Sequence, residues 1–288
     1  MLKPRLVTRL LLRLRRMASW LWPERVVLSG ATINLPPFHP LKSINVLHPR
    51  YDKFLPFLAS KLRDGSTVVD VGGNVGDTAV RLSSANSMLK IDLFEPSKDF
   101  LDFAVQNCRS NGLENVNFLN LAVGSKEKIF VDLKSGSGAR TTSAQASPAI
   151  MISLDVFYKG KDVDIDLIKI DTDGWDWDVI ASSYEVIRRF KPIIFFELQV
   201  ISEESFAGYR EALFELLSCG YSLYVFDNIG NFIFTIDDEH LIEQKLTYLV
   251  ASKNTDKAIP YYDICCGHSP EQKLLIDNTI RSFLVGEF

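Results

Sequence analysis

A glycine-dense turn beside an acid is the strongest chemical signal in this sequence. The β-prone residues 67–71 (TVVDV) contain Asp70 and lead at once into residues 72–76 (GGNVG), after which a helix is expected over residues 77–84. A buried strand, a glycine turn and a helix N-terminus together make backbone N–H groups face a nucleotide-like ligand. A plain strand–turn–helix connection has the same glycines, so this motif alone does not name a ligand.

A second acid, Glu95, ends the next apolar run, residues 89–95 (LKIDLFE). A carboxylate in this position accepts two hydrogen bonds from the vicinal hydroxyls of a ribose. The glycine loop lacks the G-x-G-x-x-G spacing of a dinucleotide fingerprint. Asp70 before it would repel a pyrophosphate but would help, through the loop, to hold a cationic amino-acid tail. These residues therefore favour S-adenosylmethionine over a nicotinamide dinucleotide.

Acids also follow the apolar residues of two later runs. Residues 165–171 (IDLIKID) end at Asp171, and residues 192–198 (PIIFFEL) carry Glu197 near their end. Apolar runs that alternate with helical patterns predict an α/β fold with a mostly parallel central sheet and helices on both faces. Ligands of such folds bind at the carboxyl ends of the strands. The acids that this fold would gather on one functional rim are Asp70, Glu95, Asp171 and Glu197.

The remaining elements follow from the spacing of apolar residues. Helical spacing predicts helices over residues 51–62, from Ser97 to Gly112, and from Phe206 to Gly220. β-prone runs predict further strands over residues 116–123, 128–133, 221–226, 232–236 and 246–251. The last three of these strands are expected to form an antiparallel edge of the sheet.

Two segments carry turn and loop signals instead. Residues 23–49 are rich in Pro, Asn and Ser and are expected to be an irregular connection, in which His39 and His48 serve a local turn or a surface hydrogen bond. Residues 135–147 are rich in Gly, Ser and Thr. Two interpretations of this stretch fit equally, a mobile loop over the site and an inert surface loop.

Composition excludes several classes of protein. Residues 1–25 carry seven Lys or Arg and one Glu, whereas the whole chain has a net charge of −4, so the body of the protein is acidic. A net-acidic body argues against nucleic acid as a partner. The four cysteines show no C-x-x-C spacing. They are expected to be free thiols in a reducing, cytoplasmic compartment, neither a metal site nor a disulfide framework.

The length of 288 residues with 47% hydrophobic content suits one domain with elaborations. We expect the main domain over residues 51–252, preceded by a basic helix and connecting segment (1–50) and followed by a tail with a final helix (253–288), which is a candidate for assembly into a homo-oligomer. Within residues 1–22, arginines and leucines recur on separate helical faces, without an apolar run long enough to span a membrane. This helix either lies on an anionic membrane surface or packs on protein; both interpretations fit.

In order and spacing, six segments of this chain resemble the FkbM family of S-adenosylmethionine-dependent methyltransferases. The segments are VVDVGGNVGD, FEPS, NLAVGS, ISLDVF, IDLIKIDTDGWDWDVI and KPIIFFEL. The resemblance covers roughly residues 48–200, and several motifs in register are far more specific than one glycine loop. It implies a class I Rossmann-like methyltransferase fold and, most often, O-methylation of a hydroxyl on a sugar, polysaccharide or natural product.

The resemblance also assigns the cofactor positions. By the resemblance, the residues that map to S-adenosylmethionine positions are Asp70, Gly72, Asn74, Gly76 and Glu95. The expected cofactor site also includes the adjacent Gly73 and Pro96, and Asn120 and Ala122, which are expected near the adenine. The chain departs from the family pattern at Gly73, where Ala is usual, and at Asp173 and Asp176, where Glu is usual.

A carboxylate near the transferred methyl group is the expected general base, and the candidates are Asp171, Asp173 and Glu197. The same three acids have an alternative use as ligands of Mg²⁺, which prefers hard oxygen donors and would lower the pKa of the acceptor hydroxyl. Two structural alternatives remain: Asp173 caps the following helix, and Glu197 pairs with a buried cation. Trp175 and Trp177 either stack on a sugar or pack under the edge of the sheet.

Three functions are compatible with these residues. The first is a methyltransferase of a sugar, polysaccharide or glycolipid hydroxyl; a lipid-linked acceptor would suit the basic N-terminal helix and a peripheral position on the membrane. A natural-product hydroxyl is the alternative acceptor. The second function is a nicotinamide-dependent oxidoreductase, which the loop spacing disfavours, and the third is a binding protein that keeps the fold without turnover.

Overall fold

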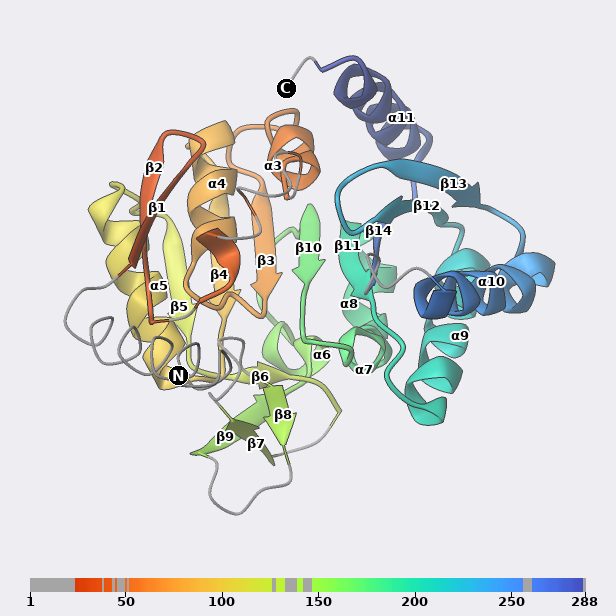
Figure 1. The fold of residues 1–288 in the computed structure, drawn as a ribbon, viewed down its shortest axis with the longest axis horizontal. Helices are drawn as coiled ribbons and strands as arrows, with labels where there is room; N and C mark the ends of the chain where they lie inside the picture. Colours follow the sequence, from red (N-terminus) through yellow and green to blue (C-terminus); the bar gives the residue numbers. More distant parts are fainter. Residues whose placement is uncertain are drawn as a thin grey trace, which may run out of the picture.

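The computed structural model of the chain describes residues 24–37, 39–42, 45, 50, 52–125, 128–132, 139–141, 147–255 and 261–286. Its centre is an eight-stranded sheet in the order β13-β12-β14-β11-β10-β3-β4-β5 (Figure 1). These strands are β3 (Thr67–Val71), β4 (Lys90–Phe94), β5 (Val116–Leu119), β10 (Leu167–Ile170), β11 (Ile193–Leu198), β12 (Ser222–Asp227), β13 (Phe232–Ile236) and β14 (Tyr262–Gly267). The five strands from β11 to β5 pair in parallel, whereas β14 and β13 pair antiparallel with their neighbours. The predicted mostly parallel sheet with an antiparallel edge is confirmed.

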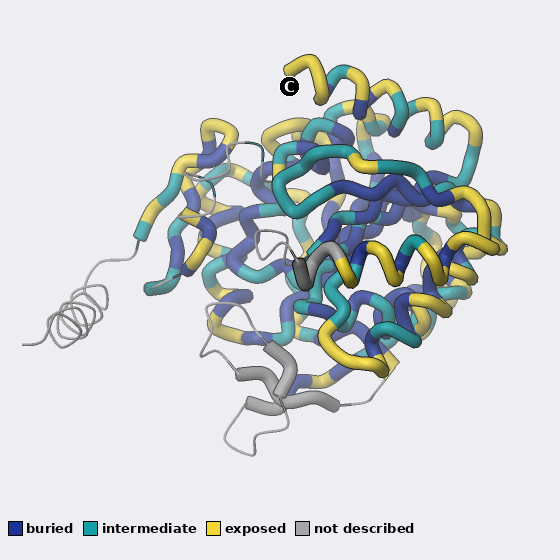
Figure 2. Tube along the Cα trace, turned by 45° about the vertical axis from the view of Figure 1, so that its right-hand side comes forward, coloured by how far each residue is buried: buried dark blue, intermediate teal, exposed yellow. Residues whose placement is uncertain are grey.

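Helices cover both faces of this sheet, as predicted. One face packs on α3 (Phe54–Ala59), α4 (Asp77–Ala85), α5 (Lys98–Ser110) and α11 (Pro270–Leu284). The other packs on α6 (Leu154–Phe157), α7 (Asp176–Ala181), α8 (Tyr184–Phe190), α9 (Glu203–Ser218) and α10 (Ile242–Thr255). Alternate residues of β3 enter the two cores, Val68 on the first face and Val69 and Val71 on the second. Figure 2 shows the buried residues along the central strands and exposed residues on the outer turns of α11.

A smaller sheet corrects the predicted strand over residues 116–123. The chain leaves the main sheet after Leu119, at the end of β5, and pairs again as β6 (Ala122–Val123) in a second sheet of order β6-β9-β7-β8. Its other strands are β7 (Lys128–Asp132), β8 (Ala139–Thr141) and β9 (Ser147–Ile152). The strand predicted from residue 128 is confirmed. The expected loop over residues 135–147 contains β8, and its other residues lie outside the described part of the chain except Ser147.

A β-hairpin occupies residues 24–35 of the segment that was predicted to be an irregular connection over residues 23–49. Strand β1 (Glu24–Leu28) pairs antiparallel with β2 (Ala31–Leu35). Ser29 and Gly30 form the turn between them, and both have positive φ angles, 49° and 81°. A two-residue turn with two positive φ angles matches the right-handed twist of a hairpin. The Ser-Gly pair between two runs of alternating apolar residues indicates this hairpin in the sequence. The prolines nearby favoured an irregular segment instead.

The C-terminal third differs from the prediction in two places. Residues 246–251, predicted as a strand, belong to α10, where Leu246 and Leu249 are buried on one helical face. Residues 262–267, expected within a tail, form β14, which lies between β11 and β12. The predicted final helix is confirmed as α11, which starts at a capping box of Ser269 and Gln272. Within the described residues, no helix has the length and apolar character needed to cross a membrane.

One buried amide joins the hairpin to the glycine loop. Asn107 on α5 is fully buried, and its Oδ1 accepts the backbone N–H of Asn34 on β2 (2.8 Å). Its Nδ2 donates to the carbonyl of Asn34 (2.9 Å) and to the carbonyl of Val75 (2.8 Å). The segment before the main domain is thereby attached to the loop that follows β3.

We expect Asn107→Ala to lower the free energy of unfolding by about 1–3 kcal/mol, because it leaves buried backbone groups without hydrogen bonds. Urea denaturation measures this change. Asn117→Ala is the matched control, since Asn117 is exposed and makes one side-chain bond to Asp92. Equal losses in the two variants would contradict the assigned role of Asn107.

Candidate active site

The glycine loop between β3 and α4 is packed against the chain itself. A Cβ on Gly72 would lie 1.8 Å from the carbonyl oxygen of Asp171, and a Cβ on Gly76 would lie 2.9 Å from Cα of Ala104. Both glycines also have positive φ angles, 79° and 77°. Close packing against β10 and α5 therefore requires glycine at these positions.

Gly73 has a different neighbour. A Cβ there would lie 2.4 Å from the side chain of Leu93 on β4. Leu93 is fully buried and occupies the space that an alanine methyl would need. The departure from the family pattern at Gly73 is thus matched by the size of the residue beneath it.

Glu95 lies directly after β4, next to the glycine loop. Its Oε2 accepts the backbone N–H of Asn74 (2.9 Å), and its Oε1 accepts that of Ser97 (2.8 Å). Burial raises the pKa of Glu95 to about 7, and these two hydrogen bonds oppose that rise. Two of roughly four lone-pair sites are used, so the carboxylate can still accept ribose hydroxyls. This donor and acceptor set fits the expected cofactor, S-adenosylmethionine.

The other predicted cofactor residues lie around the same acid. Asn120, which follows β5, donates through Nδ2 to the carbonyls of Glu95 (2.9 Å) and Pro96 (3.0 Å). This bridge ties the ends of β4 and β5 together. Ala122 is buried in β6, in the smaller sheet. Their contact with an adenine stays a prediction.

Lys169 is a residue of the site that the sequence analysis missed. It lies on β10 between its register partners Asp70 on β3 and Phe195 on β11, and it is buried. Its Nζ lies 3.2 Å from Asp70 Oδ1 and 3.5 Å from Asp171 Oδ2, and it donates to the carbonyl of Gly72 (3.0 Å). A lysine inside the apolar run LIKI was the signal, because lysine is almost never buried without a partner.

Because it is paired with Lys169, Asp70 has an indirect role in the site. Its carboxylate is fully buried beneath the loop, so its effect on a ligand passes through Lys169 and the backbone of Gly72. Burial alone would lower the pKa of Lys169, but the Asp70 and Asp171 carboxylates raise it above its ordinary value. Lys169 is therefore charged over the whole physiological range.

The acids at the ends of β10 and β11 divide into two groups. Asp171, Glu197 and Lys169 line one cavity of about 40 Å³, together with Asp263 on β14. Three phenylalanine side chains from α3, β11 and β12 form its apolar walls: Phe54, Phe195 and Phe226. Asp173 does not line this cavity. It lies in the turn after β10 with a φ angle of 52°, and burial raises its pKa to about 6.

Asp263 was not predicted, although it contributes directly to the cavity. It is the register partner of Glu197 in the antiparallel pair of β14 and β11. Side chains of directly opposed residues lie on the same face of a sheet. Burial and the surrounding carboxylates raise the pKa of both Glu197 and Asp263 well above their ordinary values. No local signal marked Asp263, because its place depends on strand pairing.

Asp176 is another of the three departures from the family pattern, and it makes hydrogen bonds despite its shorter side chain. It is fully buried, and its Oδ1 accepts both the hydroxyl and the backbone N–H of Thr172, the latter at 2.8 Å. Its Oδ2 accepts the backbone N–H of Glu197 (2.8 Å). Burial raises the pKa of Asp176 to about 7. Asp176 thus fixes the backbone of Glu197 to the turn after β10.

The expectation of Mg²⁺ gains no support from this geometry. Among the residues that the structure describes, no three or more His, Cys, Asp or Glu side chains are arranged to hold a metal ion. The predicted set of Asp171, Asp173 and Glu197 is included in that finding.

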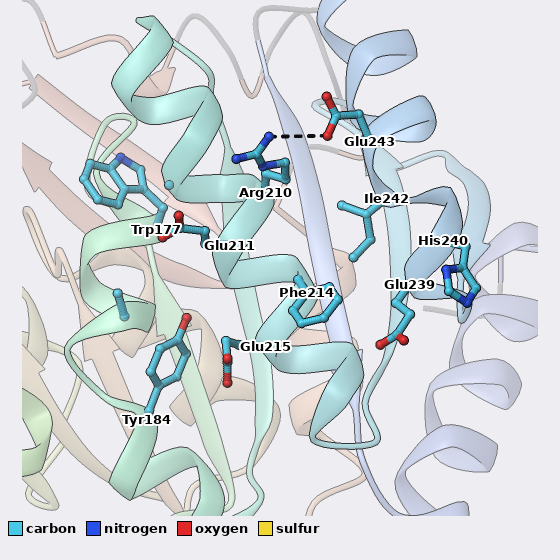
Figure 3. A pocket seen from close by; sticks show the side chains of 12 residues that line it. Trp177, Tyr184, Arg210, Glu211, Phe214, Glu215, Glu239, His240, Ile242 and Glu243 are labelled. Carbon is cyan, nitrogen blue, oxygen red and sulfur yellow. Dashed lines mark hydrogen bonds and ion pairs between the residues drawn. The ribbon is translucent and has the colours of Figure 1, made fainter.

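Of the two alternatives for Trp177, stacking on a sugar and packing within the protein, the structure favours packing, because the ring lies in a groove separate from the cavity of the rim acids. The groove, of about 450 Å³, follows the exposed side of α9 on the opposite face of the sheet from α3. Figure 3 shows Trp177 and Tyr184 on one side of α9, with Glu239 and His240 on the other. A Cβ on Gly208 would lie 2.3 Å from the Trp177 ring, so this tryptophan packs tightly on α9.

His39 makes the predicted local turn contact but is buried, so the alternative of a surface hydrogen bond is wrong; His48 lies outside the described residues. The His39 ring forms an edge contact with Phe100, with the ring centres 6.4 Å apart. Its Nδ1 accepts the backbone N–H of Leu41 (3.3 Å), and its Nε2 lies 3.2 Å from Oδ1 of Asn74 in the glycine loop. The sequence offered no signal for this contact, which joins residues 35 positions apart.

We expect Lys169→Met to lower the free energy of unfolding by about 3–5 kcal/mol, because it leaves Asp70 charged, buried and unpaired. Urea denaturation measures the loss. The double variant Asp70→Asn/Lys169→Met should recover part of it, since no buried charge remains unpaired. Lys90→Met, on the exposed side of β4, should change stability by about 0.5 kcal/mol or less. A single variant as stable as Lys90→Met would contradict the assigned role of Lys169.

We also expect the protein to be more stable in mild acid than in mild base. The raised pKa values of Glu95, Asp173 and Asp176 lie at about 6–7 in the folded state, whereas unfolded carboxyls titrate near 4. The folded state therefore binds more protons between about pH 4 and pH 7, so the free energy of unfolding falls as pH rises through that window. His39 opposes the trend, because burial lowers its pKa and its contribution is lost as pH falls.

Thermal unfolding at about pH 5.5 and pH 8 tests this balance, with a higher Tm expected at the lower pH because several carboxyls outweigh one histidine. Glu95→Gln should reduce the difference. A Tm that falls steadily from pH 8 to pH 5.5 would show that the carboxyls are not protonated in the folded state.

Comparison with known proteins identifies the family. The model of the FkbM methyltransferase domain matches residues 70–223, more than half of the chain. No curated protein matches. Similar solved structures include precorrin-6y C5,15-methyltransferase from Geobacter metallireducens GS-15 (13% identity, 75% of this chain and 86% of that chain, TM-score 0.39) and TYW2 from M. jannaschii in complex with AdoMet (11%, 85% and 84%, 0.44).

An FkbM methyltransferase from Methylobacillus flagellatus KT is also similar, with 15% identity and a TM-score of 0.37. The match covers 55% of this chain and 40% of that one. The family-model match contains the glycine loop, Glu95, Lys169 and the acids after β10 and β11. The chain belongs to the FkbM family of S-adenosylmethionine-dependent methyltransferases.

Proposed function

We propose that this enzyme methylates a hydroxyl group of a sugar, polysaccharide or glycolipid on the cytoplasmic side of the cell. The observation that carries the proposal is the cavity in which four carboxyl groups and three phenylalanine rings meet Lys169. Carboxylates accept hydrogen bonds from hydroxyls. Aromatic rings supply apolar surface for the C–H face of a sugar ring. At about 40 Å³ the cavity has room for a hydroxyl group and the edge of a sugar ring, so the rest of a polyhydroxylated acceptor would lie outside it.

The chemistry needs a group that removes the hydroxyl proton. When bound, S-adenosylmethionine supplies an electrophilic methyl group. The acceptor hydroxyl would take up that methyl group, with S-adenosylhomocysteine as the product left behind, and a carboxylate of the enzyme would accept the hydroxyl proton. A general base works best when its pKa lies near the operating pH.

Glu197 and Asp263 suit this role better than the other acids. They are directly opposed on β11 and β14, and two carboxyl groups so placed disfavour ionisation of both at once. One carboxylate of the pair remains ionised and accepts the proton of the acceptor. Asp171, held by Lys169 at 3.5 Å, orients the acceptor hydroxyl. Asp173, outside the cavity, then shapes the turn after β10.

The charges that line the cavity are nearly balanced. Its acids are Asp52, Asp171, Glu197 and Asp263, and its cationic groups are Arg50, Arg81 and Lys169. Arg81 lies 3.6 Å from Asp52, and Lys169 lies 3.5 Å from Asp171. The cavity therefore has no surplus of cationic groups for a phosphate or carboxylate on the acceptor. Neutral sugars are better candidates than sugar phosphates, and a neutral hydroxyl of a natural product is the alternative acceptor.

We expect Glu197→Gln and Asp263→Asn each to lower kcat by about 10²–10⁴-fold, the usual contribution of a general base. The affinity for S-adenosylhomocysteine should stay within about twofold, because neither residue lies at the glycine loop. Methyl transfer to a panel of neutral sugars and their phosphates, followed by mass spectrometry, measures the activity. Binding is measured by calorimetry.

Glu204→Gln is the control, since Glu204 is exposed at the start of α9. Loss of cofactor affinity in Glu197→Gln or Asp263→Asn, with unchanged kcat at saturation, would contradict the assignment of the base. Preference for sugar phosphates would contradict the neutral acceptor.

A further inference from the structure

We propose that His39 is a positioning residue for the cofactor loop, supplied by a segment outside the family domain. The family match begins at residue 70, whereas His39 follows the N-terminal hairpin. Its contact is Asn74, the central residue of the GGNVG loop and a neighbour of Glu95. The inference concerns cofactor binding and does not depend on which acceptor is methylated.

The hydrogen bonds of the ring determine which nitrogen carries the proton. Nδ1 accepts the backbone N–H of Leu41, so this nitrogen has no proton. The neutral ring must then carry its proton on Nε2, which donates to Oδ1 of Asn74. Burial lowers the pKa of His39, which favours this neutral form. The ring is thus a fixed donor aimed at the loop.

Asn74 needs such a donor. Its φ angle of 45° is in the left-handed region, which residues other than glycine adopt at a cost in conformational free energy. In that conformation its backbone N–H reaches Oε2 of Glu95 (2.9 Å), the acid that is expected to bind the ribose. With Oδ1 held by His39, the amide of Asn74 has one orientation. The same residue therefore connects His39 to the acid of the cofactor site.

The hairpin holds the loop at a second point, which makes the support two-sided. Asn107 bridges Asn34 of β2 to the carbonyl of Val75, the residue after Asn74. His39 itself is packed against Phe100 of α5 and is buried, so water does not replace its hydrogen bond readily. The loop is then preorganised before the cofactor arrives, and less conformational entropy is lost on binding.

A pair of substitutions separates positioning from packing. His39→Gln keeps an amide N–H close to the place of Nε2, whereas His39→Leu keeps the volume and removes the donor. Calorimetric titration with S-adenosylhomocysteine should give about a tenfold higher Kd for His39→Leu, and a Kd within about threefold of wild type for His39→Gln. Tm is measured for each variant, so that a loss of stability is seen separately.

A double-mutant cycle with Asn74→Ala completes the test. If His39 acts through Asn74, His39→Leu should weaken binding no further once Asn74→Ala is present. Val27→Ser, on the exposed side of β1, is the control for the hairpin and should bind as wild type does. Unchanged affinity in His39→Leu, equal losses in the Gln and Leu variants, or additive losses in the cycle would each overturn the proposal. These titrations contain no acceptor, so a failure to methylate sugars would leave their outcome intact.

Discussion

The buried ion pair of Lys169 and Asp70 is the interaction on which the rest of the site depends. The ammonium group of Lys169 lies 3.2 Å from Asp70 Oδ1 and 3.5 Å from Asp171 Oδ2, and it donates a hydrogen bond to the carbonyl of Gly72. A buried pair is weak evidence for stability, because desolvation of the two charges offsets much of their attraction. Its consequence here is geometric. One side chain determines where the glycine loop and the first rim acid lie relative to each other.

The backbone around this pair leaves little freedom for the loop. A Cβ on Gly72 would collide with the carbonyl of Asp171, so the ends of β3 and β10 are in direct contact. On the other side of β10, Asp176 accepts a hydrogen bond from the backbone N–H of Glu197. This bond connects the turn after β10 to β11. The glycine loop and the rim acids are therefore parts of one rigid arrangement of strand ends. A change at either end is transmitted through backbone contacts.

The parts of this site that were predicted from the sequence are local. Lys169 was missed although its signal, a lysine inside an apolar run, is also local, whereas the other missed parts depend on strand pairing or on distant contacts. Apolar runs that end in Asp70, Glu95, Asp171 and Glu197 predicted the parallel strands and most of the rim. Asp263 and β14 were missed because a short run near the C-terminus shows no sign that it enters the middle of the sheet. His39 was missed for the same reason, since its partner lies in a distant loop.

The acids on the rim repel one another, so the surrounding structure has to hold them in place. Burial raises the pKa of Asp176, and burial with neighbouring carboxylates raises those of Glu197 and Asp263, so each group opposes folding when ionised. A cluster that destabilises the folded state persists where its chemistry is needed. Strong packing elsewhere must offset it, and the two apolar cores on either face of the sheet are the source. Because the acids lie at the strand ends, between those two cores, one rigid scaffold keeps several carboxyl groups close together with raised pKa values.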